Sequence, residues 1–154
     1  MKLFLARHGA AETGVGGDPP LSAKGRDDVQ RLAAFLGVGG VRVQRVLHSP
    51  LKRARETALL FAAATGPGPL VEEIAEGLLP EDSTDTIAYA LAAWDADIML
   101  VGHMPNLGHL ASRLLTGDDQ GAVIAFERGA VACFEREDDG WILNWLLAPG
   151  LIGR

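Results

Sequence analysis

Two histidines that each follow a short apolar stretch are the residues of this sequence best suited to chemistry. The run 2–6 leads into Arg7-His8-Gly9, and the run 98–101 leads into Gly102-His103. Apolar runs of this length are typical of buried parallel strands, and ligands of open α/β sheets bind at the carboxyl ends of such strands. We therefore expect the two histidines to meet at one edge of a sheet.

His8 is the leading candidate for a nucleophile. A neutral imidazole can attack phosphorus and form a phosphohistidine that water then hydrolyses. The reaction needs one ring nitrogen free and the other holding its proton against an acceptor, such as a backbone carbonyl. Arg7, directly before it, could bind phosphoryl oxygens bidentately and oppose the charge that grows on them. The alternative for each residue is a strand-end side chain without a role.

Arg53 is the second arginine that could hold a phosphoryl group. Ser49 as the cap and Pro50 at the first helical position predict the start of a helix over 51–65. Arg53 then falls in the first turn, where its guanidinium lies beside free backbone N–H groups that favour anions. Lys52 and Arg55 fall on other faces of this helix, where we expect them to be solvated.

His103 is the fourth candidate. Pro105 opens another predicted helix immediately after it, so the imidazole and the backbone N–H of Met104 could both reach a phosphoryl oxygen. Taken alone, a histidine here is more often a cap than a catalytic group. The specific signal is the convergence of candidates from three strand ends, namely Arg7, His8, Arg53 and His103.

The elements that must position these residues alternate between strand and helix. We expect strands at 2–6, 44–48, 70–71 and 98–101, and helices from the Ser22 cap to Gly37, over 51–65, over 87–94, and from Pro105 to Gly117. Later strands are expected at 122–126, 131–135 and 141–146, with a hairpin turn at 138–140. This order predicts an α/β fold with a mainly parallel central sheet sandwiched by helices, formed by 1–154 as a single domain.

Composition limits the classes of partner. The chain has 154 residues, 48% of them hydrophobic, and a net charge of −6, which disfavours wholesale binding to nucleic acid or anionic membranes. The single cysteine, Cys133, excludes an internal disulfide, and no apolar run approaches the ~20 residues of a membrane span. We expect a soluble cytoplasmic protein with no cofactor.

The remaining histidines offer weaker candidates. His48 precedes Ser49 near the expected pocket and could support it from behind, whereas His109 lies within a predicted helix and is expected to be structural or exposed. No histidine pair shares a helical face with a carboxylate, and HExxH is absent, so no metal site is predicted. The glycine-rich stretch 14–17 lies in a loop over 10–20 and does not join a strand directly to a helix. We therefore interpret the loop 10–20 as a rim loop rather than a dinucleotide site.

Three segments together resemble the signatures of the histidine phosphatase (phosphoglycerate mutase-like) superfamily. They are Arg7-His8-Gly9, the stretch from Ser49 to Ala58 (SPLKRARETA) and Gly102-His103, and the stretch 20–25 (PLSAKG) resembles the family's first-helix start. They occur in the family's order over nearly the whole chain. The resemblance implies that His8 is the nucleophile and that Arg7, Arg53 and His103 form the phosphate pocket. The loop 73–78 corresponds to the family's acid segment, where Glu76 is the candidate general acid; the alternative is an ordinary acidic surface loop.

Two departures from the family pattern narrow the function. The stretch 10–14 (AAETG) replaces the usual continuation of the first signature, which weakens a mutase function. Residues 66–97 have room for only a short strand, a loop and one helix, so the helical lid of larger relatives is not expected. An open groove suits a side chain presented by a protein. This compact form is similar to the bacterial SixA-type phosphohistidine phosphatases.

Three functions remain open on the sequence. The first is a metal-independent phosphatase that hydrolyses phosphohistidine on a signalling or phosphotransfer protein through phospho-His8. The second is a phosphatase of small phosphomonoesters with Glu76 as general acid, and the third is a phosphate-binding module without activity. The third is weakest, because a decayed site would be expected to have lost some of its four central residues.

Overall fold

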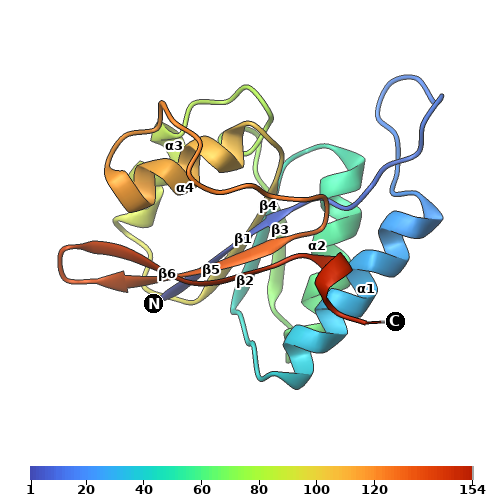
Figure 1. Ribbon diagram of the computed structural model, residues 1–154, viewed down its shortest axis with the longest axis horizontal. Coiled ribbons are helices and arrows are strands. Elements are labelled where there is room, and N and C mark those ends of the chain that lie inside the picture. The colour runs from blue at the N-terminus through green and yellow to red at the C-terminus, as the bar shows by residue number, and fades with distance from the viewer. Residues whose placement is uncertain (154) are drawn as a thin grey trace.

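The computed structural model describes residues 1–153 and forms a six-stranded sheet of order β3-β2-β4-β1-β5-β6 (Figure 1). Neighbouring strands are parallel from β3 to β1, and the last two pairs are antiparallel. The strands are β1 (Lys2–Arg7), β2 (Arg45–His48), β3 (Leu70–Glu73), β4 (Ile98–Gly102), β5 (Val131–Glu137) and β6 (Gly140–Leu147). The predicted mainly parallel sheet is confirmed.

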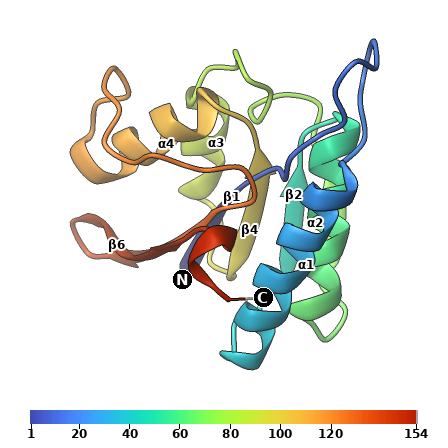
Figure 2. The same cartoon turned by 45° about the vertical axis from the view of Figure 1, so that its right-hand side comes forward.

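Helices cover both faces of the sheet, as Figure 2 shows. One face carries α1 (Ala23–Val38) and α2 (Lys52–Ala64), and the other carries α3 (Asp85–Leu91) and α4 (Asn106–Thr116). Along β1, Leu3 and Leu5 pack toward α3 and α4, whereas Phe4 and Ala6 pack toward α1 and α2. Both faces of this strand are therefore buried, which explains why its sequence is continuously apolar.

The central strands bring the candidate residues to one edge. Strand β1 pairs in parallel with β4 and antiparallel with β5, and the pairing with β4 ends at Arg7 opposite Gly102. The His8 backbone N–H then donates to the Gly102 carbonyl oxygen at 3.0 Å. The carboxyl ends of the two strands are thus joined where the sequence places its histidines.

Helix α1 starts as predicted but ends later. The Ser22 hydroxyl accepts from the Gly25 backbone N–H at 3.0 Å and caps the helix. The predicted end at Gly37 is wrong, since the helix runs to Val38. Gly37 serves a close contact instead, because a Cβ there would lie 2.4 Å from the Ala64 carbonyl oxygen at the end of α2.

The predicted serine cap of α2 is also wrong. The helix begins at Lys52 after the N-cap residue Leu51, and the Ser49 hydroxyl contacts His103 and the Leu51 backbone N–H, ahead of the helix. The cap comes from the rim loop: both Asp18 carboxylate oxygens accept from the Lys52 backbone N–H, at 3.0 and 3.1 Å. A contact between residues 34 positions apart lies outside what a local cap pattern can predict.

The segment 122–126 is irregular, contrary to the predicted strand. Its apolar residues Ile124 and Phe126 are buried in the core beneath α3 and α4 instead of pairing with the sheet. The hairpin turn at 138–140 is confirmed, with β5 and β6 each slightly longer than predicted. Between Gly66 and Asp97 the chain forms only β3 and α3, so the predicted lack of a helical lid is confirmed. Within residues 1–153, no helix is long and apolar enough to cross a membrane.

Candidate active site

The structure brings together the four residues that the sequence singles out. Arg7 and His8 follow one another at the end of β1, Arg53 lies in the first turn of α2, and His103 follows β4. The centroids of the two imidazole rings lie 4.8 Å apart, and Arg53 Nε lies 3.5 Å from His8 Nε2. All four line a depression of about 530 Å³ at the edge of the sheet.

The His8 ring is held in the state that a nucleophile needs. Its Nδ1 lies 2.7 Å from the Gly9 carbonyl oxygen, the backbone acceptor that the chemistry requires, and its Nε2 faces Arg53, whose Nε donates to it at 3.5 Å. Burial is the largest cause that lowers the pKa of His8 to about 4; the Gly9 hydrogen bond opposes it, and the charges of Arg53 and Arg7 act with it. At neutral pH the ring is uncharged, so Nε2 carries a lone pair.

A threonine joins His8 to the helix that carries Arg53. The Gly9 backbone N–H donates to Thr57 Oγ1 at 3.1 Å, and that hydroxyl donates to the Arg53 carbonyl oxygen at 2.8 Å. Thr57 is fully buried, and a Cβ at Gly9 would lie only 2.8 Å from Val29 Cγ2. Close packing and this hydrogen-bond chain therefore fix His8 and Arg53 relative to each other.

Ser49 positions the second histidine. Its hydroxyl lies 2.6 Å from His103 Nε2 and also accepts from the Leu51 backbone N–H at 3.3 Å. Because the hydroxyl has no other acceptor within the described residues, we assign its proton to the bond with Nε2, which leaves the proton of the neutral ring on Nδ1. That nitrogen is buried and has no hydrogen-bond partner within the described residues. Burial lowers the pKa of His103 to about 3, aided by His8 and Arg53, so the ring is a neutral donor.

The two arginines complete a cationic wall. Arg7 donates through Nη1 to the Phe126 carbonyl oxygen at 2.7 Å, while its buried Nε has no partner within residues 1–153. Burial and the charge of Arg128 lower the pKa of Arg7 from its usual value. Arg53 lies 4.0 Å from an Asp18 carboxylate oxygen, so the rim loop that caps α2 also contacts this guanidinium.

Arg128 is a site residue that the sequence analysis missed. It lines the same depression from the turn before β5, and its charge is among the causes that lower the pKa values of Arg7 and His8. No motif marks it, because it reaches the site through sheet pairing and lies 121 positions after Arg7 (128 − 7). The sequence predicts Ser49 only as a helix cap, and its contact with His103 has no local signal either.

The other predicted residues lie in different surroundings. Met104 lines the depression, whereas Glu76 is exposed and lies outside its lining; the carboxylate among the lining residues is that of Glu12, from the rim loop. His48 is buried, with Nδ1 2.7 Å from the Ser49 carbonyl oxygen. His109 lies in α4 and does not line the depression; its Nδ1 lies 2.6 Å from the Asp119 carbonyl oxygen. No group of three or more potential metal ligands occurs among residues 1–153.

Sequence comparison identifies the class of protein that this fold and site define. Residues 3–80 match the model of the histidine phosphatase superfamily (branch 1). The chain is 33% identical to an uncharacterized protein of Picosynechococcus, SYNPCC7002_A2622, over 96% of this chain and 99% of that one. The chain belongs to the histidine phosphatase superfamily and is a phosphatase-type hydrolase by membership.

Comparison with SixA proteins gives a closer placement within that superfamily. The chain is 27% identical to the phosphohistidine phosphatase SixA of Escherichia coli K12, over 97% of this chain and 94% of that protein. It superposes on a structure of the protein histidine phosphatase SixA complexed with tungstate, with a TM-score of 0.88 and 26% identity over 98% of this chain and 99% of that one. The chain is therefore a SixA homologue in sequence and in fold.

Proposed function

We propose that this protein hydrolyses phosphohistidine on a protein substrate through a covalent phospho-His8 intermediate. One observation carries the proposal: a neutral imidazole, anchored through Nδ1 to Gly9, presents an unprotonated Nε2 that lies 3.5 Å from Arg53 Nε, on a ring beside that of His103. A nucleophile and donors for phosphoryl oxygens in one depression are what in-line transfer to nitrogen requires.

The proposed reaction has two steps. His8 Nε2 attacks phosphorus and forms a new P–N bond while the P–N bond to the substrate imidazole breaks. The substrate ring, protonated on its other nitrogen, leaves as neutral imidazole. Arg7, Arg53 and the Nδ1–H of His103 bind the three phosphoryl oxygens and oppose their growing charge. A water molecule then attacks phospho-His8, and the P–Nε2 bond breaks. The water oxygen stays on the departing phosphate, and the proton that the water loses is taken up by phosphate or by solvent.

The leaving group explains why a protein phosphohistidine fits this site. An imidazole leaves near its protonation point at neutral pH, so it needs less general-acid help than an alkoxide. The exposed position of Glu76, away from the depression, is compatible with such a reaction. The lack of a helical lid leaves the site open to a side chain on a folded partner. The E. coli relative that bears the name phosphohistidine phosphatase supports the same substrate class.

A second function, hydrolysis of small phosphomonoesters, is favoured by one observation. Glu12 lines the depression that holds His8 and could protonate an alkoxide leaving group. Glu76 remains the acid predicted from the family resemblance. If esters are the substrates, Glu12→Gln or Glu76→Gln should lower kcat on an ester by roughly 10²-fold or more, the usual contribution of general acid catalysis, with a much smaller loss on phosphohistidine.

Substrate preference tests the proposal directly. We would measure kcat/KM of the wild-type protein on a histidine-phosphotransfer domain phosphorylated with phosphoramidate, and on a panel of phosphomonoesters. We expect the phosphorylated domain to be turned over with the highest kcat/KM. A higher kcat/KM for any small ester would contradict the proposal and favour the second function.

A further inference from the structure

The backbone of a hydrogen-bonded turn places Arg128 at the edge of the active site. It lies in a tight turn closed by the Ala130 N–H, which donates to the Glu127 carbonyl oxygen at 3.0 Å. Gly129, next in the turn, has φ of +80° and donates its N–H to the carbonyl oxygens of Arg7 (3.1 Å) and His8 (3.0 Å). The turn is thus hydrogen-bonded to the two residues that begin the site.

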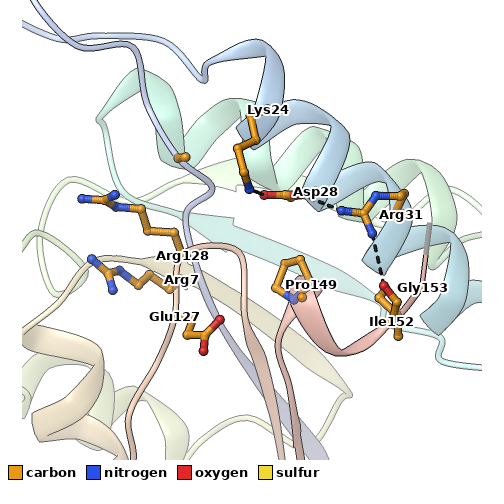
Figure 3. A pocket seen from close by; sticks show the side chains of 11 residues that line it. Arg7, Lys24, Asp28, Arg31, Glu127, Arg128, Pro149, Ile152 and Gly153 are labelled. Carbon is orange, nitrogen blue, oxygen red and sulfur yellow. Dashed lines mark hydrogen bonds and ion pairs between the residues drawn. The ribbon is translucent and has the colours of Figure 1, made fainter.

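The Arg128 side chain lies beside Arg7 without a partner of its own. Figure 3 shows the two guanidiniums extending in the same direction, with the Glu127 carboxylate turned away from both. Arg128 is exposed, and it makes no hydrogen bond or ion pair within residues 1–153. Two neighbouring cations with no carboxylate between them repel each other, and a bound anion would relieve that repulsion.

Three arginines line the depression, one more than the two charges of a dianionic phosphoryl group, and Glu12 is the carboxylate among its lining residues. Arg7 and Arg53 together carry two positive charges, and the low pKa values of His8 and His103 keep both rings neutral. These two cations already match a dianionic phosphoryl group. Arg128 adds a further positive charge at the rim, so it is available for a second anionic group on the same substrate.

A groove leads away from this point across the molecule. It has a volume of about 810 Å³ and shares Arg7 and Arg128 with the catalytic depression. From there it passes between α1 and the turn at Pro149 (Figure 3). The cations on its α1 wall are already paired, since Lys24 and Arg31 both bind Asp28, at 2.5 and 2.6 Å. Arg7 and Arg128 are therefore the cations of this groove without an ion pair within residues 1–153, and Arg7 already belongs to the proposed phosphoryl site.

We propose that Arg128 binds a carboxylate of the substrate protein next to its phosphohistidine, while the groove between α1 and Pro149 holds the flanking segment. This inference rests on the proposed phosphohistidine function. It assigns a substrate class within that function: phosphohistidines with Asp or Glu beside them are preferred. A protein of net charge −6 would otherwise repel such a sequence.

Two phosphohistidine peptides of the same sequence provide the test, one with Asp and Glu around the phosphohistidine and the other with Asn and Gln there. Binding is measured by calorimetry in a His8→Ala background, which prevents turnover. We expect the acidic peptide to bind roughly two- to five-fold more tightly, about the effect of one ion pair at an exposed site. Adding Arg128→Gln should abolish this preference, whereas Arg55→Gln, an exposed arginine of α2, should keep it.

Each contrary outcome is distinct. If both phosphopeptides still bind better than their unphosphorylated forms but show no charge preference, or if the preference survives Arg128→Gln, the inference is overturned while the proposed function stands. An equal loss on both peptides with Arg128→Gln would place Arg128 on the phosphoryl group and also overturn it. If phosphorylation does not improve binding of either peptide, the proposed function fails and this inference fails with it.

Discussion

At the scale of single residues, burial sets the charge of the two central imidazoles. Desolvation is the largest cause of the low pKa of both His8 and His103, and the neighbouring arginines act in the same direction. A carboxylate beside either ring would have the opposite effect, and none contacts them within residues 1–153. Burial and neighbouring cations therefore keep the proposed nucleophile, His8, unprotonated.

The titration of these rings follows from their surroundings. We expect the imidazole C–H resonances of His8 and His103, assigned with His8→Ala and His103→Ala, to stay at their neutral positions in NMR spectra from pH 8 to pH 5. Because the folded pKa values lie below the unfolded value of 6.5, the unfolded chain takes up protons first. The free energy of unfolding should then fall as pH drops from about 6.5 toward 4. Protonation of either ring near pH 6.5 in the folded protein would contradict this account.

Ser49 gives a second prediction at this scale. We expect Ser49→Ala to lower kcat about ten-fold, the loss of roughly one hydrogen bond, because His103 loses the hydroxyl that fixes its tautomer. KM should change less, since Arg7 and Arg53 still bind the phosphoryl group. Nitrogen NMR shifts of His103 should show a mixture of tautomers in the variant. Ser112→Ala is the matched control, because it also removes a buried hydroxyl, one that donates to the Asp118 carbonyl oxygen. It should leave kcat and the His103 nitrogen shifts unchanged.

At the scale of elements, the parts that could be predicted are those with a local pattern. Strands β1 and β4 were predictable because burial on both faces demands continuous apolar residues, and the Ser22 cap because its partner lies three residues away. The cap of α2 could not be predicted, because Asp18 reaches the helix start from a loop distant in the sequence. Segment 122–126 has the apolar content of a strand, and only the assembled core decides that it packs without pairing.

The Asp18 contact predicts a coupling between the rim loop and α2. We expect Asp18→Ala to lower the free energy of unfolding by about 0.5–2 kcal/mol, the usual effect of losing a helix cap. It should also raise KM for the phosphorylated domain, because the loop that lines the depression loses its attachment to the helix that carries Arg53. Chemical denaturation and steady-state kinetics measure the two effects. Asp138→Ala, in the β5–β6 turn, is the control, and equal effects from both variants would refute the coupling.

At the scale of the whole molecule, the sheet gathers a site whose members are scattered along the chain. Four of its residues could be found from the sequence, because each follows a strand or starts a helix with a recognisable pattern. Arg128 could not, because its position depends on the pairing of β5 with β1 and on the turn bonded to Arg7 and His8. The open groove likewise exists only once α1 and the turn at Pro149 face each other.

The composition of the site predicts catalysis that does not depend on a metal. The proposed nucleophile and the proposed phosphoryl ligands are all nitrogen groups, and each charge on the phosphoryl group is matched by an arginine. We expect dialysis against a strong chelator to leave kcat/KM on the phosphorylated domain within two-fold of its starting value. Added Mg²⁺ or Zn²⁺ should not raise it. Loss of activity on chelation, restored by one metal, would refute this prediction.

The most direct test of the central claim is to locate the phosphoryl group during turnover. We would mix the wild-type protein with the phosphorylated domain, quench in alkali within milliseconds, and map the adduct by mass spectrometry. The account predicts one phosphoryl group on His8, absent from His8→Ala, which should also lack activity. A phosphoryl group on any other residue, or turnover by His8→Ala at the wild-type rate, would contradict it.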